Sequence, residues 1–273
     1  MRTLTLLALS LSAWAANPPD VNAVVRKALS SEIARQQKLA NYTWEETTIE
    51  KTFDQKGKSL GSHTKTFENL ILDGSEYRRL VQEDGKPLSA DRARKEQEKM
   101  DREIAKRKAE SESQRRHRVE EQAKKRQEAV RFREEVLSAF NFSLAGEESI
   151  KGVDSWKVQA EPKRGFVGQS RQGKMVLGKI HGSMWISKSD SDLLKIDAET
   201  IDKITFGGFL ASLSAGSHIG LEMMRVNSEL WHPETISIGI NARALWKRVN
   251  VEVEVAFRNF RKFKTESKLI AED

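Results

Sequence analysis

The sequence predicts a mainly β protein of the α+β class, built on one wide, curled antiparallel sheet. The first observation is a series of strand-length segments with period-two alternation, separated by turn pairs such as Asp84-Gly85 and Lys151-Gly152. The second is their number, about nine to eleven, because sheets of that width curl into a barrel or half-barrel. The third is a highly charged stretch over residues 89–138 without Pro or Gly, which predicts a long helical insertion.

The N-terminus has the pattern of a secretory signal peptide. The segment "MRTLTLLALSLSAWAA" contains Arg2, an apolar stretch over Leu4–Leu11, and the cleavage-site pattern Ala13-Trp14-Ala15. We therefore expect residues 1–16 to be removed and residues 17–273 to form an exported, soluble domain. The chain has no cysteine, so we expect neither disulfides nor a lipid anchor on an N-terminal Cys.

A helix is predicted at the start of the mature chain. Asp20 follows Pro18-Pro19 and is suited to cap a helix. Five apolar residues then recur at helical spacing, which predicts an amphipathic helix that ends near Leu39. They are Val21, Val24, Val25, Ala28 and Leu29.

The predicted strands form two groups, one on each side of the charged stretch. The first group runs from Tyr42 to Gly85, and the second begins at Phe140. The clearest strand is "LWKRVNVEVEVAFRNF", in which valines at alternate positions share one face and charged residues occupy the other. A turn over residues 189–192 separates "GKIHGSMWISKSD" from its return strand.

The charged insertion over residues 89–138 mixes acidic and basic residues finely, as in "RVEEQAKKRQE". This pattern favours i,i+4 ion pairs on an exposed helix, and interleaved aromatics that could stack on bases are lacking. A nucleic-acid partner is therefore not expected, although the chain has a net charge of +7. We expect one long helix or a helical hairpin bent near Ser111–Ser113, with few apolar positions, namely Met100, Ile104, Val119 and Val130.

Three roles remain open for this insertion. It could be a solvated face without a ligand, a surface attracted to anionic membranes, or the contact site of a protein partner, including one bound to a membrane.

The sequence carries no recognisable catalytic or metal-binding motif. The segment "GQSRQGKM" (residues 168–175) differs from the phosphate-binding G-x-x-x-x-G-K-[ST] motif because Met175 replaces the hydroxyl residue. No helix pattern follows it, so we expect a loop there. The five histidines lack metal-site spacing, and no G-x-S-x-G elbow is present. We therefore expect no enzyme activity, no cofactor and no metal.

Several segments carry a resemblance to a known family. They are the signal peptide, the helix before "NYTWEETTIE", the hairpin "GKIHGSMWISKSDSDLLKIDAET" with Trp185-Ile186, and the unit "LEMMRVNSELWHPETISI". In these features the sequence resembles the periplasmic lipoprotein-carrier family, the LolA/LolB-like outer-membrane lipoprotein-sorting proteins. The resemblance covers most of the chain outside the charged insertion, which the basic carrier fold lacks. Ser187 stands where the family often has Asp.

The resemblance implies an unclosed half-barrel with an apolar concave face covered by helices. It also implies a periplasmic carrier that binds lipid or lipoprotein acyl chains without covalent chemistry. An apolar groove suffices for that, since burial of an acyl chain gains about 0.8 kcal/mol per CH₂. The alternative is a periplasmic sensor or scaffold that contacts a protein partner through its charged helix. The residues expected to line the cavity, or to pack against each other as core, are Tyr42, Trp44, Met184, Ile186, Met223, Val251, Val253 and Val255.

Overall fold

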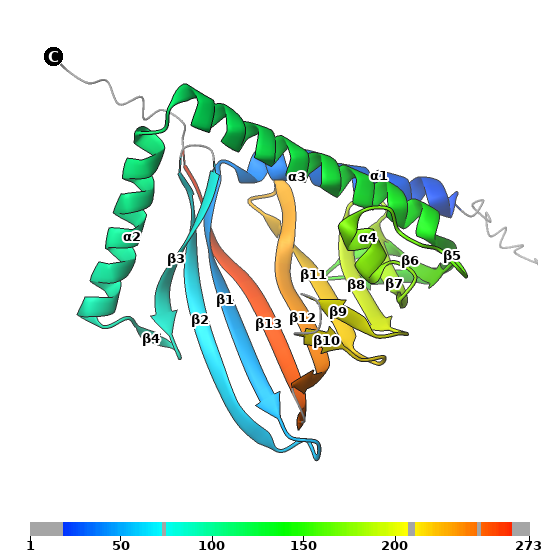
Figure 1. Ribbon diagram of the computed structural model, residues 1–273. Helices are drawn as coiled ribbons and strands as arrows, with labels where there is room; N and C mark the ends of the chain where they lie inside the picture. Colours follow the sequence, from blue (N-terminus) through cyan, green and yellow to red (C-terminus); the bar gives the residue numbers. More distant parts are fainter. Residues whose placement is uncertain (1–18, 73–74, 207–210, 245–246, 264–273) are drawn as a thin grey trace, which may run out of the picture.

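The computed structural model describes residues 19–72, 75–206, 211–244 and 247–263. The expected signal peptide, residues 1–16, lies outside the described residues. Within them, an N-terminal helix is followed by two groups of strands, one on each side of the helical insertion, as the sequence predicts, and Figure 1 shows their arrangement.

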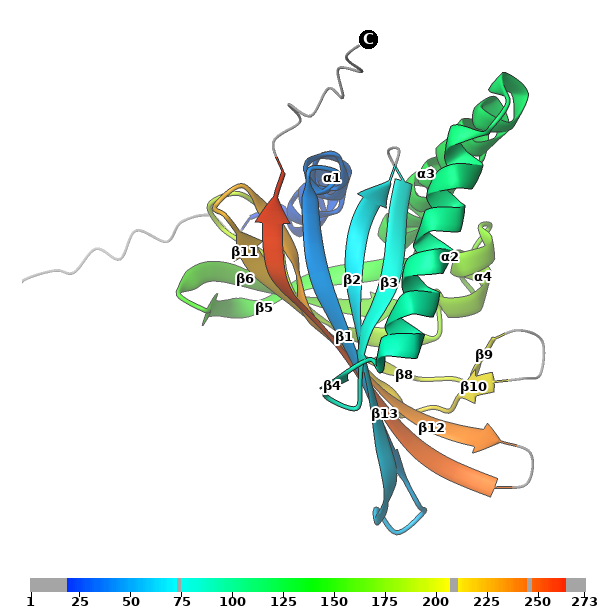
Figure 2. The same cartoon turned by 90° about the vertical axis from the view of Figure 1, so that its left-hand side faces the viewer.

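One eleven-stranded sheet, antiparallel between all the neighbouring strands described, forms the body of the protein. The sheet is strongly twisted and curled, and its two edges, β4 and β5, do not pair with each other (Figures 1 and 2). The predicted fold class is therefore confirmed: a mainly β protein with an unclosed half-barrel. In order across the sheet the strands are β4 (Lys86–Pro87), β3 (Ser75–Glu83), β2 (Ser59–Leu72), β1 (Tyr42–Phe53), β13 (Lys247–Lys262), β12 (Leu230–Ala244), β11 (His218–Val226), β8 (Leu193–Thr200), β7 (Ile180–Ser187), β6 (Val153–Pro162) and β5 (Phe140–Ile150).

A small second sheet lies over β12. It consists of β9 (Ile204–Phe206) and β10 (Ala211–Leu213), which pair antiparallel. The first strand of the large sheet, β1, lies in its interior and pairs with the last, β13.

The N-terminal helix α1 (Val21–Leu39) begins and ends where the sequence predicts. Asp20 caps it, since its Oδ1 accepts a hydrogen bond from the backbone N–H of Ala23 at 3.1 Å. Val25 and Ala28, both on the predicted apolar stripe, are buried against Val158 and Ile186 of the sheet. The amphipathic pattern thus fixes α1 on one face of the sheet.

The charged insertion folds into two helices, α2 (Ala90–Lys108) and α3 (Glu112–Ala139), which diverge from a bend (Figure 1). The bend falls just before the predicted Ser111–Ser113 step. Ser111 starts α3 with a capping box: its Oγ accepts from the N–H of Gln114 at 3.3 Å, and its own N–H donates to Gln114 Oε1 at 2.9 Å. We call residues 106–118, which span the bend, the elbow.

The two helices of the insertion rest on different parts of the body. Helix α2 lies along β3, where Arg79 donates to Oε1 of Gln97 at 3.0 Å, and it has no buried residue. Helix α3 packs against α1 and against the short helix α4 (Arg171–Val176). The insertion is therefore part of the folded body and not a detached spacer.

Two predicted turns are confirmed in detail. Lys151 and Gly152 both have positive φ angles, 51° and 80°, as a two-residue hairpin between β5 and β6 requires. Residues 188–192 connect β7 to β8, and Ser187 Oγ accepts from the N–H of Ser189 at 3.3 Å.

Candidate functional site

An apolar hollow of about 450 Å³ lies where three helices meet the sheet. Its walls come from α1, α3 and α4, and its floor comes from β11, the start of β12 and the start of β8. We call it the apolar hollow. Its apolar lining residues are Ala28, Leu29, Ala129, Phe132, Met175, Val176, Leu193, Leu221, Met223, Trp231 and Pro233.

Two arginines on the rim of the apolar hollow form hydrogen bonds between the elements that surround it. Arg133 of α3 donates through Nη1 to the carbonyl oxygen of Leu29 in α1 at 3.4 Å. Arg35 of α1 donates through Nη1 to the carbonyl oxygen of Trp231 in β12 at 3.5 Å. Their charged heads therefore bind backbone carbonyls, while their aliphatic stems can face the hollow.

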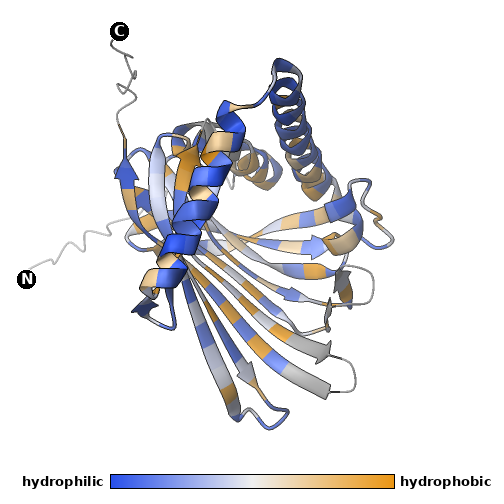
Figure 3. Ribbon diagram, turned by 60° about the vertical axis from the view of Figure 1, so that its left-hand side comes forward, coloured by the Kyte–Doolittle hydropathy of each residue, from blue (hydrophilic) through white to orange (hydrophobic). Residues whose placement is uncertain are grey.

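The floor of the hollow continues as an apolar sheet face beyond the helices. Directly opposite residues of an antiparallel pair share one face, and Leu221 pairs with Ile196 and Ile236, while Ile236 pairs with Val255. A second row runs in parallel through Ile219, Ile238 and Val253, and Ile240 pairs with Val251. All these side chains are half-buried, and Figure 3 shows the apolar positions alternating with polar ones along the strands. We call this surface the apolar face.

The structure brings some of the sequence-predicted residues to this region. Met223 is buried and lines the apolar hollow. Val251, Val253 and Val255 lie on the apolar face, half-buried. Met184 pairs with Ile196 and therefore belongs to the same face.

Three other predicted residues are packed by the protein's own side chains. Ile186 is fully buried against Val25 of α1. Tyr42 and Trp44 belong to a separate cluster with Val226 and Leu230. Their ligand contacts remain a prediction, and the structure gives them a core position.

That separate cluster is centred on an aromatic group around His232. The imidazole lies 5.7 Å from the Trp44 ring, 5.0 Å from Phe257 and 4.8 Å from Phe260, between ring centroids. Its Nδ1 lies 2.7 Å from the carbonyl oxygen of Pro233, so the neutral tautomer that donates there satisfies both groups. Burial lowers the pKa of His232 to about 4, partly opposed by the bond to Pro233.

Sequence reasoning missed the helical wall of the hollow. Phe132 of α3 and Met175 of α4 line it, and neither was a candidate. The available signal was the apolar pair Phe132 and Val136, four residues apart at the end of a charged run. The apolar positions that were noted there, Val119 and Val130, are exposed by 49% and 36%.

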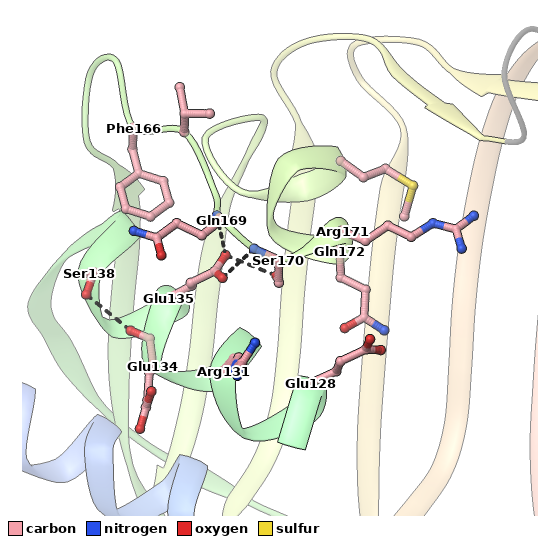
Figure 4. A pocket seen from close by; sticks show the side chains of 12 residues that line it. Glu128, Arg131, Glu134, Glu135, Ser138, Phe166, Gln169, Ser170, Arg171 and Gln172 are labelled. Atoms are coloured by element: carbon pink, nitrogen blue, oxygen red, sulfur yellow. Dashed lines mark hydrogen bonds between the residues drawn. The ribbon is translucent and has the colours of Figure 1, made fainter. Parts of the chain in front are cut away.

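A second, polar hollow of about 960 Å³ adjoins the first (Figure 4). It lies between the C-terminal half of α3 and residues 166–175, and Gln172 and Met175 line both hollows. Two cations, Arg131 and Arg171, and two exposed carboxylates, Glu128 and Glu134, stand around it.

The near-match to a phosphate-binding loop has a different role in this structure. Most of the segment, from Arg171 onward, belongs to the short helix α4 (Arg171–Val176), so the expectation of a loop there was wrong. Glu135 of α3 fills the place an anion would take: it accepts from the N–H groups of Gln169 at 3.1 Å and Ser170 at 2.6 Å, and from Ser170 Oγ at 3.1 Å (Figure 4). A Cβ on Gly173 would lie 1.9 Å from Glu135 Oε2, which explains the glycine. The segment is therefore an attachment point for α3.

Within the described part of the chain, no group of three or more His, Asp or Glu side chains could hold a metal ion. Over the same residues, no helix is both long enough and apolar enough to cross a membrane.

Comparisons with known proteins give similarity at the level of solved structures. No protein-family model matches the chain, and no curated protein matches it. A DUF1329 family protein from Desulfovibrio piger is 11% identical with a TM-score of 0.36, over 92% of this chain and 96% of that one. An outer membrane lipoprotein-sorting protein domain from Vibrio parahaemolyticus is 11% identical with a TM-score of 0.35, over 89% and 95%. A LolA superfamily protein from Nitrosomonas europaea is 10% identical with a TM-score of 0.33, over 94% and 99%.

Proposed function

We propose that this protein is a periplasmic carrier that binds an acyl chain of a lipid or lipoprotein in the apolar hollow. The observation that carries the proposal is an apolar hollow that remains open beneath α1, α3 and α4 and continues onto the apolar face. Its volume of about 450 Å³ falls in the range of roughly 300–1,000 Å³ of small-molecule sites.

Hydrocarbon burial alone supplies enough free energy for such binding. Ten methylene groups transferred from water to this lining would gain about 8 kcal/mol before the costs of ordering the ligand. No catalytic group is needed, and the rim arginines Arg35 and Arg133 direct their charge to backbone carbonyls. The hollow is therefore suited to bind and release a chain unchanged.

The adjoining polar hollow gives the ligand an orientation. Since Gln172 and Met175 line both spaces, a tail in the apolar hollow would place its polar headgroup beside Arg131 and Arg171. Both guanidinium groups are exposed and can meet an anionic or amide-bearing headgroup. An amphiphile with one buried chain fits this arrangement.

A scaffold that binds a protein partner is the second candidate. The observation that favours it is α2, which has no buried residue and presents charge along its length. Replacing the exposed α2 residues Arg94, Lys95, Glu98 and Arg102 with Gln separates the two functions: a scaffold loses its partner, whereas a carrier keeps its site, because the lining of the hollow contains no α2 residue.

The main experiment fills the apolar hollow. Ala129 is half-buried and lines the hollow, so Ala129→Phe places a ring where the chain would lie. Ala105→Phe introduces the same side chain on the exposed surface of α2 and serves as the control. Displacing two methylenes should weaken binding of a fluorescent fatty acid by at least about tenfold. Circular dichroism monitors the fold of both variants.

Two results would contradict the proposal. One is equal fatty-acid affinity in both variants and the unmodified protein. The other is a purified protein that neither yields an amphiphile on organic extraction nor binds the fluorescent probe.

A further inference from the structure

The net charge of the helical insertion is confined to its elbow. Residues 90–105 carry five basic and five acidic side chains, and so do residues 119–139. Residues 106–118, the elbow, carry six basic and two acidic side chains. Outside the elbow the two helices thus carry no net charge, and an excess of four positive charges lies in the elbow that joins them.

Two of the six cations hold the elbow in shape. Arg107 donates to Oε1 of Glu103 at 2.8 Å and to the carbonyl oxygen of Leu72, at the end of β2. Arg118 pairs with Glu110 at 2.9 Å, and both side chains are largely buried. The Arg107 contacts bind the elbow to the body, and the Arg118 pair occupies Glu110, one of the two carboxylates of the elbow.

The other four cations are Lys106, Lys108, Arg115 and Arg116. All four are exposed, and none forms an ion pair or hydrogen bond with any residue that the structure describes. Figure 2 shows the elbow at the far end of the two helices, where α2 and α3 meet. Val119, one turn beyond Arg115 and Arg116, adds an apolar side chain that is 49% exposed.

We propose that the elbow docks the protein on an anionic lipid surface. A convex point with four free cations and one exposed valine suits a flat, diffuse layer of negative headgroups, where each Lys or Arg strengthens binding about fivefold. The elbow contains no Phe, Trp or Tyr for stacking on nucleic-acid bases. Neither of the two hollows described above is lined by a residue of the elbow.

Vesicle co-sedimentation tests this surface. The probes are vesicles of phosphatidylcholine alone and vesicles with one third phosphatidylglycerol. We expect binding to the anionic vesicles only, and loss of that binding in 1 M NaCl, where charges are screened beyond about 3 Å.

Matched variants locate the binding surface. The elbow variant replaces Lys106, Lys108, Arg115 and Arg116 with Gln, and should bind anionic vesicles several hundredfold more weakly at about fivefold per cation. The control variant removes the same charge elsewhere on the two helices and should bind at least tenfold more tightly than the elbow variant. It replaces the exposed residues Lys95, Arg102, Lys125 and Arg126 with Gln.

Several outcomes would overturn the inference. They are equal losses in the two variants, equal binding to neutral and anionic vesicles, or binding of poly-glutamate without binding of anionic vesicles. The vesicle assay does not depend on the carrier proposal, because the elbow variant keeps the apolar hollow. A variant that binds fatty acid normally but no longer binds vesicles supports both proposals.

Discussion

His232 should make the stability of this protein depend on pH. The residue is 5% exposed and its ring lies among Trp44, Phe257 and Phe260, and burial lowers its pKa from 6.5 to about 4. The positive charge of Arg35 acts in the same direction as burial. The folded protein therefore keeps this imidazole neutral at pH values where the unfolded chain protonates it.

The sign and size of the effect follow from this difference. Between pH 4 and 6.5 the unfolded state binds more protons, so stability is complete above pH 6.5 and falls as the pH is lowered through that window. Each pKa unit corresponds to about 1.36 kcal/mol, so His232 should remove about 2 kcal/mol of unfolding free energy between pH 7.5 and pH 5.0.

The assay is urea unfolding at both pH values, followed by circular dichroism. Carboxylates also titrate, so the comparison is with His232→Phe, which keeps an aromatic ring in the cluster and removes the titration. The exposed residue His117 provides the control variant His117→Phe, which should retain the pH dependence of the unmodified protein. If His232→Phe loses as much stability as the unmodified protein over this range, the buried-histidine account is wrong.

Two further predictions concern how α3 is held. Ser111→Ala removes the capping box of α3 and should lower the free energy of unfolding in urea by about 1 kcal/mol. The control is Ser89→Ala, at an N-cap without a side-chain hydrogen bond, which should lower it much less. Equal losses in the two variants would contradict the capping role of Ser111. Gly173→Ala forces a methyl group against Glu135 and should destabilise the protein by about 1–3 kcal/mol. Gly239→Ala is the control and should destabilise it less, because the added Cβ meets no atom nearer than 3.7 Å. A lower thermal midpoint for Gly239→Ala than for Gly173→Ala would refute the attachment of α3 through Glu135.

The local elements of this fold were predictable because their signals are contained in short segments. Helix α1 has a cap at Asp20 and apolar residues at helical spacing, and β13 has strict alternation through Val251, Val253 and Val255. The width of the sheet followed from the number of such segments. These features need no knowledge of which distant residues meet.

The candidate site was only partly predictable because distant segments build it. Its walls come from Leu29, Phe132 and Met175, whose positions are set by how α3 and α4 pack. Helix α4 itself was missed because it is six residues long, contains Gly173, and depends on Ser170 and Glu135 for its start. Tyr42 and Trp44 carry the same strand pattern as true cavity residues, and only the tertiary packing separates the two cases.

The pairing of β1 with β13 has a consequence for how the chain folds. Tyr42 lies opposite Lys262, so this seam inside the sheet joins segments from nearly opposite ends of the polypeptide. Contacts so far apart in sequence slow folding, because a long loop must close before they form. During synthesis from the N-terminus, the edge of β1 that pairs with β13 stays unpaired until this last strand has been made. Closure of this seam is therefore expected to be the late, rate-limiting step, and the interval before it is when the chain most needs protection from aggregation.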